Sequence, residues 1–130
     1  STMSKMKSAI SGEYVIQINE EGSVKVFRIY DNVIGSLREI AESKGFVYDS
    51  NWNTRQFGSN IIKEFGEGNQ AFVGEYVVTK RDNGSIETYR EYDNTKGALR
   101  EVSEKTGFTY DPSWNTRQFG SKLVDYLLTK

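Results

Sequence analysis

The chain lacks two residue types altogether: it contains no cysteine and no histidine among its 130 residues. Without cysteine it can form no disulfide and perform no thiol chemistry, and without histidine it lacks the commonest metal ligand and acid–base group. No apolar run approaches the roughly 20 residues that a membrane-spanning helix needs, and no charged-then-apolar leader is typical of a signal peptide. We therefore expect no metal site, no cofactor, no membrane partner and a cytoplasmic location.

An excess of positive charge is also missing. The sequence has 17 Lys and Arg residues against 18 Asp and Glu residues, which gives a formal net charge of −1. Proteins that are drawn to nucleic acid or to anionic membranes by bulk electrostatics usually carry a basic surface. The charge balance therefore gives no reason to expect either partner.

One stretch of eight residues occurs twice. The octet Trp-Asn-Thr-Arg-Gln-Phe-Gly-Ser fills positions 52–59 and returns unchanged at 114–121. At this offset residues 12–66 align with residues 74–128 without a gap, and 27 of the 55 aligned positions are identical. Two copies are too few for a solenoid, which needs three or more repeats. A unit this short has little core of its own, so we expect the two copies to share one, as a covalent mimic of a homodimer does.

The repeat predicts the organisation of the chain. An N-terminal arm occupies residues 1–11, the first repeat residues 12–66, a short linker residues 67–73 and the second repeat residues 74–130. The fold class that we expect is α+β, with a tandem duplication of a ββαα unit packed as one pseudo-twofold domain. The oligomeric state is not predicted.

Two strands are expected at the start of each copy, because apolar residues alternate there. In the first copy the alternation covers residues 13–19 and 23–31, and Gly22 lies in the turn between them. In the second copy the turn is Asp-Asn-Gly at 82–84, which is a stronger hairpin signal. Each pair of strands therefore predicts an antiparallel hairpin.

Two helices are expected after each hairpin. The Asp-Asn pair at 31–32 offers an N-cap, and Gly45 is placed to end the first helix in the left-handed conformation. The second helix is predicted to begin after Asp49, where the second copy has Asp-Pro at 111–112, an N-cap followed by a proline in the first turn. It carries the octet and runs to about Phe65.

The octet helix has two faces when it is drawn at about 100° per residue. The expected core face comprises Thr54, Phe57, Gly58, Ile61, Ile62 and Phe65. The opposite face carries the candidate binding residues Trp52, Arg55, Gln56 and Ser59, with their counterparts Trp114, Arg117, Gln118 and Ser121. These residues are identical in the two copies, whereas Asn60 and its counterpart Lys122 differ. The identity indicates a constraint on this face, although a recent duplication explains part of it.

Three interpretations of the octet stay open. In a structural one, Trp52 folds back on Phe46 or Tyr48, while Arg55 stacks on it or pairs with Asp49. In the second, the two octets pack against each other, since a self-complementary patch must be identical on both sides. In the third they bind a ligand: Trp and Arg are frequent anchors of protein interfaces, and Asn, Arg and Gln near a helix N-terminus can read DNA base edges.

Four apolar positions of the first copy are polar in the second. Ile18, Val26, Ile29 and Ile34 are replaced by Lys80, Thr88, Glu91 and Lys96. This difference predicts extra apolar surface on the first copy. Either the N-terminal arm covers it through Met3, Met6 and Ile10, or it binds a partner, because contiguous exposed apolar area usually marks an interaction site.

Signatures of catalysis are missing. The sequence has no Ser-His-Asp or Cys-His set, no P-loop and no dinucleotide-binding glycine fingerprint. Carboxylates recur in both copies at Asp31/Asp93, Glu39/Glu101 and Asp49/Asp111. Two of these pairs lie at predicted helix starts, where capping explains them, but two-carboxylate chemistry stays open because the sequence does not give their separation. We expect the protein not to be an enzyme.

The sequence thus favours a non-enzymatic binding or adaptor module that uses the surfaces of the octet helices, with another protein as its partner. The alternative is a nucleic-acid-binding regulator that uses the two octet helices as readers. A basic stripe joining Arg55 and Arg117 would favour nucleic acid, and an apolar patch around Ile29 would favour a protein.

Overall fold

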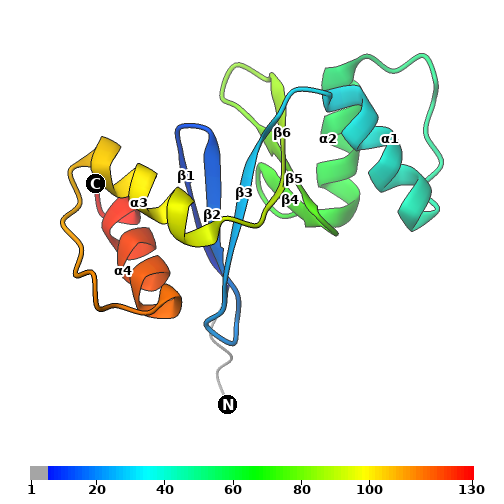
Figure 1. Cartoon of the computed structure of the whole chain (residues 1–130). Helices are drawn as coiled ribbons and strands as arrows, with labels where there is room; N and C mark the ends of the chain where they lie inside the picture. Colours follow the sequence, from blue (N-terminus) through cyan, green and yellow to red (C-terminus); the bar gives the residue numbers. More distant parts are fainter. Residues whose placement is uncertain (1–5) are drawn as a thin grey trace. The chain divides into compact units, whose positions relative to one another are not determined.

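The computed structural model describes residues 6–130 (Figure 1). These residues form six strands and four helices in the order β1 (Lys7–Ser11), β2 (Tyr14–Ile18), β3 (Val24–Tyr30), α1 (Val33–Lys44), α2 (Thr54–Phe65), β4 (Gln70–Val73), β5 (Tyr76–Lys80), β6 (Ile86–Tyr92), α3 (Thr95–Thr106) and α4 (Thr116–Leu128). Strand β2 pairs with β1 and β3, and β5 pairs with β4 and β6, always antiparallel. The predicted α+β class is confirmed.

The chain folds into two compact units that do not coincide with the two sequence copies. Residues 6–28 and 91–130 form one, here named the terminal unit, and Ile29–Arg90 forms the other, the central unit. In Figure 1 the blue strands β1 and β2 lie beside the yellow and red helices α3 and α4 of the terminal unit. The central unit combines α1 and α2 with β4 and β5. Each unit therefore takes its strands from one copy and its helices from the other.

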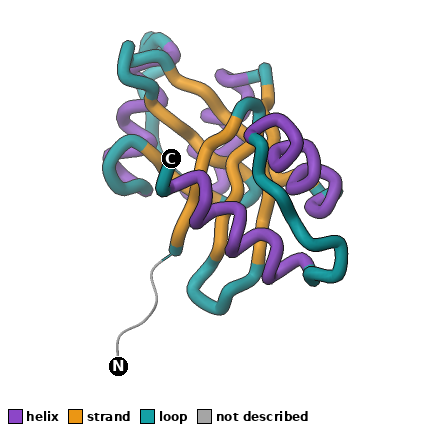
Figure 2. The backbone as a smooth tube through the Cα atoms, turned by 90° about the vertical axis from the view of Figure 1, so that its left-hand side faces the viewer, coloured by secondary structure: helices purple, strands orange, loops and turns teal. Residues whose placement is uncertain are grey.

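The core of the terminal unit shows this exchange residue by residue. Its buried members are Ala9, Tyr14, Ile16, Ile18 and Val26 from the strands, and Ala98, Leu99, Val102, Phe119, Leu123 and Val124 from the helices. The strand residues alternate along β2, as one face of a strand must. In Figure 2, where this unit faces the viewer, the helix that ends at the C-terminus passes in front of the strands.

The core of the central unit has the complementary composition. Its buried members are Leu37, Ile40, Ala41, Phe57, Ile61 and Ile62 from α1 and α2, and Ala71, Val73, Tyr76, Val78 and Ile86 from β4, β5 and β6. The buried part of the predicted core stripe of α2 is therefore confirmed. The stripe faces strands of the second copy. The pseudo-twofold packing of the copies and their origin by duplication stay predictions.

The caps of the first helix in each copy are as predicted. The Asn32 side chain accepts a hydrogen bond from the Gly35 amide at 3.1 Å, and Gly45 ends α1 with a φ of 66°. In the same way, Asn94 caps the start of α3 and Gly107 ends it. These caps depend only on residues within one turn of the helix end.

The start of the second helix is not where the sequence predicts it. Helix α2 begins at Thr54, with Asn53 as its N-cap, rather than after Asp49. The Asp49 carboxylate instead accepts a hydrogen bond from the Asn51 amide at 2.8 Å, and Asp111 does the same for the Ser113 amide at 2.9 Å. An Asp side chain that bonds the backbone two residues ahead forms a turn, so both aspartates shape a loop before the helix.

Strands β1 and β4 are additional to the predicted elements. Strand β1 lies in the predicted arm and β4 in the predicted linker. Each returns to the next strand through a tight turn at a glycine with positive φ, 57° at Gly12 and 58° at Gly74. The runs Lys-Ser-Ala-Ile-Ser and Gln-Ala-Phe-Val do not alternate apolar with polar residues, which is the pattern that predicts a half-buried strand. Residues 1–5, and with them Met3, lie outside the described residues.

The prediction of extra apolar surface on the first copy is wrong for two of its four positions. Ile18 and Val26 are 8% and 1% exposed and belong to the core of the terminal unit. Their side chains face α3 and α4, which come from the other copy. Ile34 is half-buried, and Ile29 alone stays 38% exposed. A single residue of this exposure is common on protein surfaces.

Candidate functional site

The asparagine and glutamine of the octet form a capping box. The Asn53 side chain accepts from the Gln56 amide at 2.8 Å, and the Gln56 side chain accepts from the Asn53 amide at 2.9 Å. Asn115 and Gln118 repeat both bonds at the same distances. Two backbone donors that a helix start leaves free are thereby satisfied. The helix start itself therefore explains why Gln is the same in both copies.

The octet tryptophan packs within its own unit. The Trp52 ring centroid lies 6.4 Å from that of Phe46 and 5.9 Å from that of Phe57, and Tyr48 stacks on Phe57 at 4.6 Å. The fold-back of Trp52 on Phe46, which the structural interpretation predicts, is present. The same ring cluster recurs in the terminal unit around Trp114, Phe108, Phe119 and Tyr110.

The octet arginine holds a hairpin turn of the other copy. Arg55 Nη1 donates to the Asn83 carbonyl at 2.9 Å, in the turn between β5 and β6. Arg117 donates to the Glu21 carbonyl, in the turn between β2 and β3. These bonds differ from the predicted stacking on Trp52 and the predicted pairing with Asp49. The glycine of each turn leaves the space: a Cβ at Gly84 would lie 2.8 Å from Arg55 Nη1.

The octet glycine allows a close approach between helix and strand. A Cβ at Gly58 would lie 2.5 Å from Ile86 Cγ1, and one at Gly120 would lie 2.5 Å from Val24 Cγ2. The octet phenylalanines are buried, and Ser59 and Ser121 are half-buried. Capping, ring packing, turn contacts and close approach thus explain six of the eight octet positions. The prediction that its outer residues bind a partner stays a prediction.

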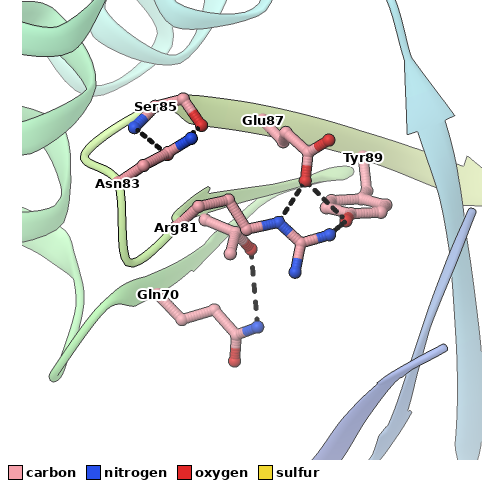
Figure 3. Close-up of polar contacts among 7 residues, drawn as sticks. Gln70, Arg81, Asn83, Ser85, Glu87 and Tyr89 are labelled. Carbon is pink, nitrogen blue, oxygen red and sulfur yellow. Dashed lines mark hydrogen bonds and ion pairs between the residues drawn. The ribbon is translucent and has the colours of Figure 1, made fainter. Parts of the chain in front are cut away.

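The turn that Arg55 contacts is also braced from within the hairpin (Figure 3), and all the bracing residues except Ser85 differ from their counterparts in the first copy. Arg81 forms an ion pair with Glu87 and donates to the Tyr89 hydroxyl at 3.2 Å, and that hydroxyl donates to Glu87 at 3.3 Å. Across the turn, Asn83 Oδ1 accepts from the Ser85 amide and hydroxyl. Burial raises the pKa of Tyr89 to about 12.

A second group of residues repeats identically outside the octet. In the terminal unit, the Arg28 guanidinium carbon lies 5.9 Å from the ring centroid of Tyr14 and 5.4 Å from that of Tyr92. Arg28 also pairs with Glu13 at 3.0 Å, and the Tyr14 hydroxyl donates to Glu101 at 3.1 Å. Burial, helped by this hydrogen bond, raises the pKa of Tyr14 to about 12. We name this set the terminal tyrosine–arginine cluster.

The central unit contains the equivalent set, the central tyrosine–arginine cluster. The Arg90 guanidinium carbon lies 5.4 Å from the Tyr30 centroid and 5.8 Å from the Tyr76 centroid, and Arg90 pairs with Glu75 at 3.3 Å. Burial and a hydrogen bond to Glu39 raise the pKa of Tyr76 above its ordinary value. All five residues are identical to those of the terminal cluster at aligned positions. Of these residues, only Glu39 and Glu101 are recognisable from the sequence as candidates, because they are recurring carboxylates.

A surface pocket adjoins the central cluster. It has a volume of about 260 Å³ and is lined by Glu39, Ile40, Ser43, Val73, Gly74, Glu75 and Tyr76. Buried apolar side chains form its floor, and the two glutamates lie at its rim. The position aligned with Ser43 is Lys105, whose ammonium nitrogen lies 3.2 Å from Glu101 Oε2 and lowers the pKa of that carboxyl.

Comparison with known proteins gives no relative: no family model, no curated protein and no solved structure matches this chain. Within residues 6–130, no helix is long and apolar enough to cross a membrane. The same part of the chain holds no group of three or more Asp, Glu, His or Cys residues that could bind a metal ion.

Proposed function

We propose that this protein is a non-enzymatic binding module whose partner is another protein. The observation that supports the proposal is the tyrosine–arginine cluster, in which two tyrosines, one arginine and two glutamates recur in both units. In each cluster the arginine guanidinium is held over two tyrosine rings. Almost half of the arginine side-chain surface stays exposed, 46% for Arg28 and 45% for Arg90. Tyr and Arg are enriched in the residues that dominate protein interfaces.

The geometry of the clusters favours binding because it fixes the arginine before any partner arrives. An exposed arginine normally loses side-chain freedom when it is immobilised at an interface, at about 0.5–1.5 kcal/mol per side chain. Contacts to two rings and one carboxylate already restrict Arg28 and Arg90. Donors of each guanidinium that do not face the carboxylate stay available for a partner.

The recurring carboxylates support a non-enzymatic function. Glu39 and Glu101 accept hydrogen bonds from tyrosines, and Asp49 and Asp111 hold turns. A general acid at neutral pH needs a raised carboxyl pKa, whereas the carboxyl pKa values of Glu101 and Asp111 are lowered by their hydrogen bonds. Structural roles therefore explain these four residues without a reaction.

The nucleic-acid alternative has less support. It relies on Arg55 and Arg117 as readers of bases, but both guanidiniums donate to backbone carbonyls of hairpin turns. A guanidinium that reads guanine uses two parallel donors, but one terminal nitrogen of Arg55 and both terminal nitrogens of Arg117 already donate hydrogen bonds within the protein. The octet surface nevertheless differs from the tyrosine–arginine clusters, so an experiment can separate the two.

The test compares two double variants with the wild-type chain in partner capture from the native host. Arg28→Gln with Arg90→Gln alters both tyrosine–arginine clusters, and Arg55→Ala with Arg117→Ala alters both octets. We expect the first variant to lose the proteins that wild type captures and the second to keep them, with both folded by circular dichroism. Loss in the octet variant alone would contradict the proposed surface. Capture that disappears after nuclease treatment would move the nucleic-acid alternative ahead.

We also infer that the chain is a tandem duplication in which the helices of each copy pack on the strands of the other. The gapless alignment of 27 identical positions supports the duplication. Strands β1 and β4 precede the aligned region by the same spacing in both copies, so the repeated unit is βββαα rather than ββαα. On this view the protein presents two equivalent binding surfaces, one for each unit.

A further inference from the structure

The pocket beside the central cluster combines an apolar floor with an acidic rim. Ile40, Val73 and Tyr76 form the floor, and all three are at least nine-tenths buried. Glu39 and Glu75 contribute the rim, and Glu75 is already paired with Arg90. No ion pair among residues 6–130 involves Glu39. A pocket of this kind suits an alkyl chain that ends in a positive charge, because the chain can lie on apolar surface while its charged end stays at the rim.

The terminal unit shows how the same carboxylate is used when a cation is present. Glu101 aligns with Glu39, accepts the same tyrosine hydrogen bond, and binds the Lys105 ammonium at 3.2 Å. Lys105 lies four residues after Glu101 on α3, the spacing at which helical side chains meet. In the central unit the aligned position is Ser43, whose hydroxyl donates to the Ile40 carbonyl of its own helix. The two units therefore differ at this carboxylate: one supplies its own ammonium and the other does not.

We propose that the central pocket binds a primary ammonium group on an alkyl chain, with Glu39 as its counter-ion in the place that Glu101 occupies for Lys105. An ammonium carries three donors, and the rim offers carboxylate and hydroxyl acceptors to meet them. The identification of the ligand as a lysine side chain of a partner protein rests on the proposed function, but binding of the ammonium itself does not. In the terminal unit Glu101 already has the ammonium of Lys105 as its partner, on an exposed side chain, so we expect one such site.

The test uses Nα-acetyl-lysine amide as the ligand and the full chain, followed by backbone amide NMR. We expect saturable shifts of the Ser43 and Gly74 amides, which lie in the pocket lining. Nα,Nε-diacetyl-lysine amide has the same alkyl chain without the charge and serves as the matched control. Shifts of equal size with this neutral compound would overturn the proposal, as would tighter binding of Nα-acetyl-arginine amide.

Three variants assign the binding to named residues. Glu39→Gln keeps an acceptor for Tyr76 but removes the charge, so the affinity should fall about tenfold. Ser43→Lys copies the residue of the terminal unit and should abolish binding by supplying an internal ammonium. Lys105→Ser should create a second site, with new shifts at Gly12 and Glu101. Unchanged binding in Ser43→Lys would overturn the proposal even if Glu39→Gln were unfolded.

Failure of this test and failure of the proposed function are separable. If the lysine compound does not bind, the protein can still capture partners through Arg28 and Arg90. If the compound binds but no protein partner depends on the arginines, the ammonium site stands without the binding function. Each result therefore decides one proposal only.

Discussion

Replacement of Gly58 by alanine tests whether helices and strands are exchanged between the copies. A Cβ at this position would lie 2.5–2.7 Å from three side-chain atoms of Ile86, far inside the roughly 3.5–4.0 Å of a normal carbon contact. Ile86 is β-branched and stiff at χ1, so the cost should approach the upper end of the about 1–3 kcal/mol found for overpacking. Alanine gains about 1 kcal/mol over glycine in a helix, which leaves a net loss of stability of about 2 kcal/mol.

The partner of the clash is identified by a second substitution. Ile86→Ala removes all three atoms, so in that background Gly58→Ala should no longer be destabilising, a coupling of about 2–3 kcal/mol. Val24 provides the matched control, because it is the counterpart of Ile86 in the first copy. If the first copy folded on its own strands, Val24 would be the neighbour of Gly58. We therefore expect no coupling between Gly58→Ala and Val24→Ala.

Urea denaturation of the single and double variants measures both couplings from changes in the free energy of unfolding. The wild-type chain, the single variants and the double variants together form two double-mutant cycles, one for Gly58 with Ile86 and one for Gly58 with Val24. Coupling to Val24 together with independence from Ile86 would refute the exchange of helices. A Gly58→Ala variant that is as stable as wild type would show that Gly58 lies farther from Ile86 than the 2.5 Å between an added Cβ and Ile86 Cγ1 indicates.

Four further expectations follow from the structure. Phe57→Ala should lower the free energy of unfolding by about 3–5 kcal/mol, and a loss below about 1 kcal/mol would contradict its burial. Residues 12–66 expressed alone should be unstable or dimeric, because their helices lack the strands they pack on; a stable monomer with the full chain's melting temperature would oppose this. Arg55→Ala with Arg117→Ala should cost less than about 2 kcal/mol, since each side chain is exposed, and a larger loss would make them structural. The pKa of Tyr14 is raised to about 12 in the folded state, so its contribution to stability is complete below the unfolded value of about 10 and is lost as the pH rises toward 12; urea midpoints that are equal at about pH 9 and 11.5 would contradict it.

Features that depend on neighbouring residues could be predicted from the sequence. The hairpin turns at Gly22 and Gly84 have positive φ angles, and Asn32 and Gly45 cap α1 as expected. Each of these structures is decided by residues within about one turn of the chain. The helix start after Asp49 was predicted incorrectly for the same reason, since an Asp can form a local turn as readily as a helix cap.

Features that depend on the partner of an element could not be predicted. Two copies with the same apolar pattern allow either helix pair to cover either set of strands. The periodicity of a helix predicts which of its faces is buried, but it does not predict which strands that face packs against. The tyrosine–arginine clusters could not be predicted for the same reason, because each cluster joins residues of both copies. In the terminal cluster, Tyr14 and Arg28 come from the first copy and Tyr92 and Glu101 from the second. The only sequence signal was their identity in the two copies.

Positions at which the two copies differ indicate which helices pack on which strands, whereas identical positions do not. Val26 of the first copy aligns with Thr88 of the second, and Ser36 aligns with Ala98. If each copy packed on itself, Ser36 would face Val26 and Thr88 would face Ala98, so each buried hydroxyl would meet an apolar side chain. In the structure Thr88 Oγ1 lies 3.2 Å from Ser36 Oγ, with both residues fully buried, and Val26 and Ala98 share the other core. The Ser36 hydroxyl donates to the Asn32 carbonyl at the start of its own helix and therefore has a partner in either packing, but only the exchanged packing places the two buried hydroxyls side by side and leaves the other pair apolar.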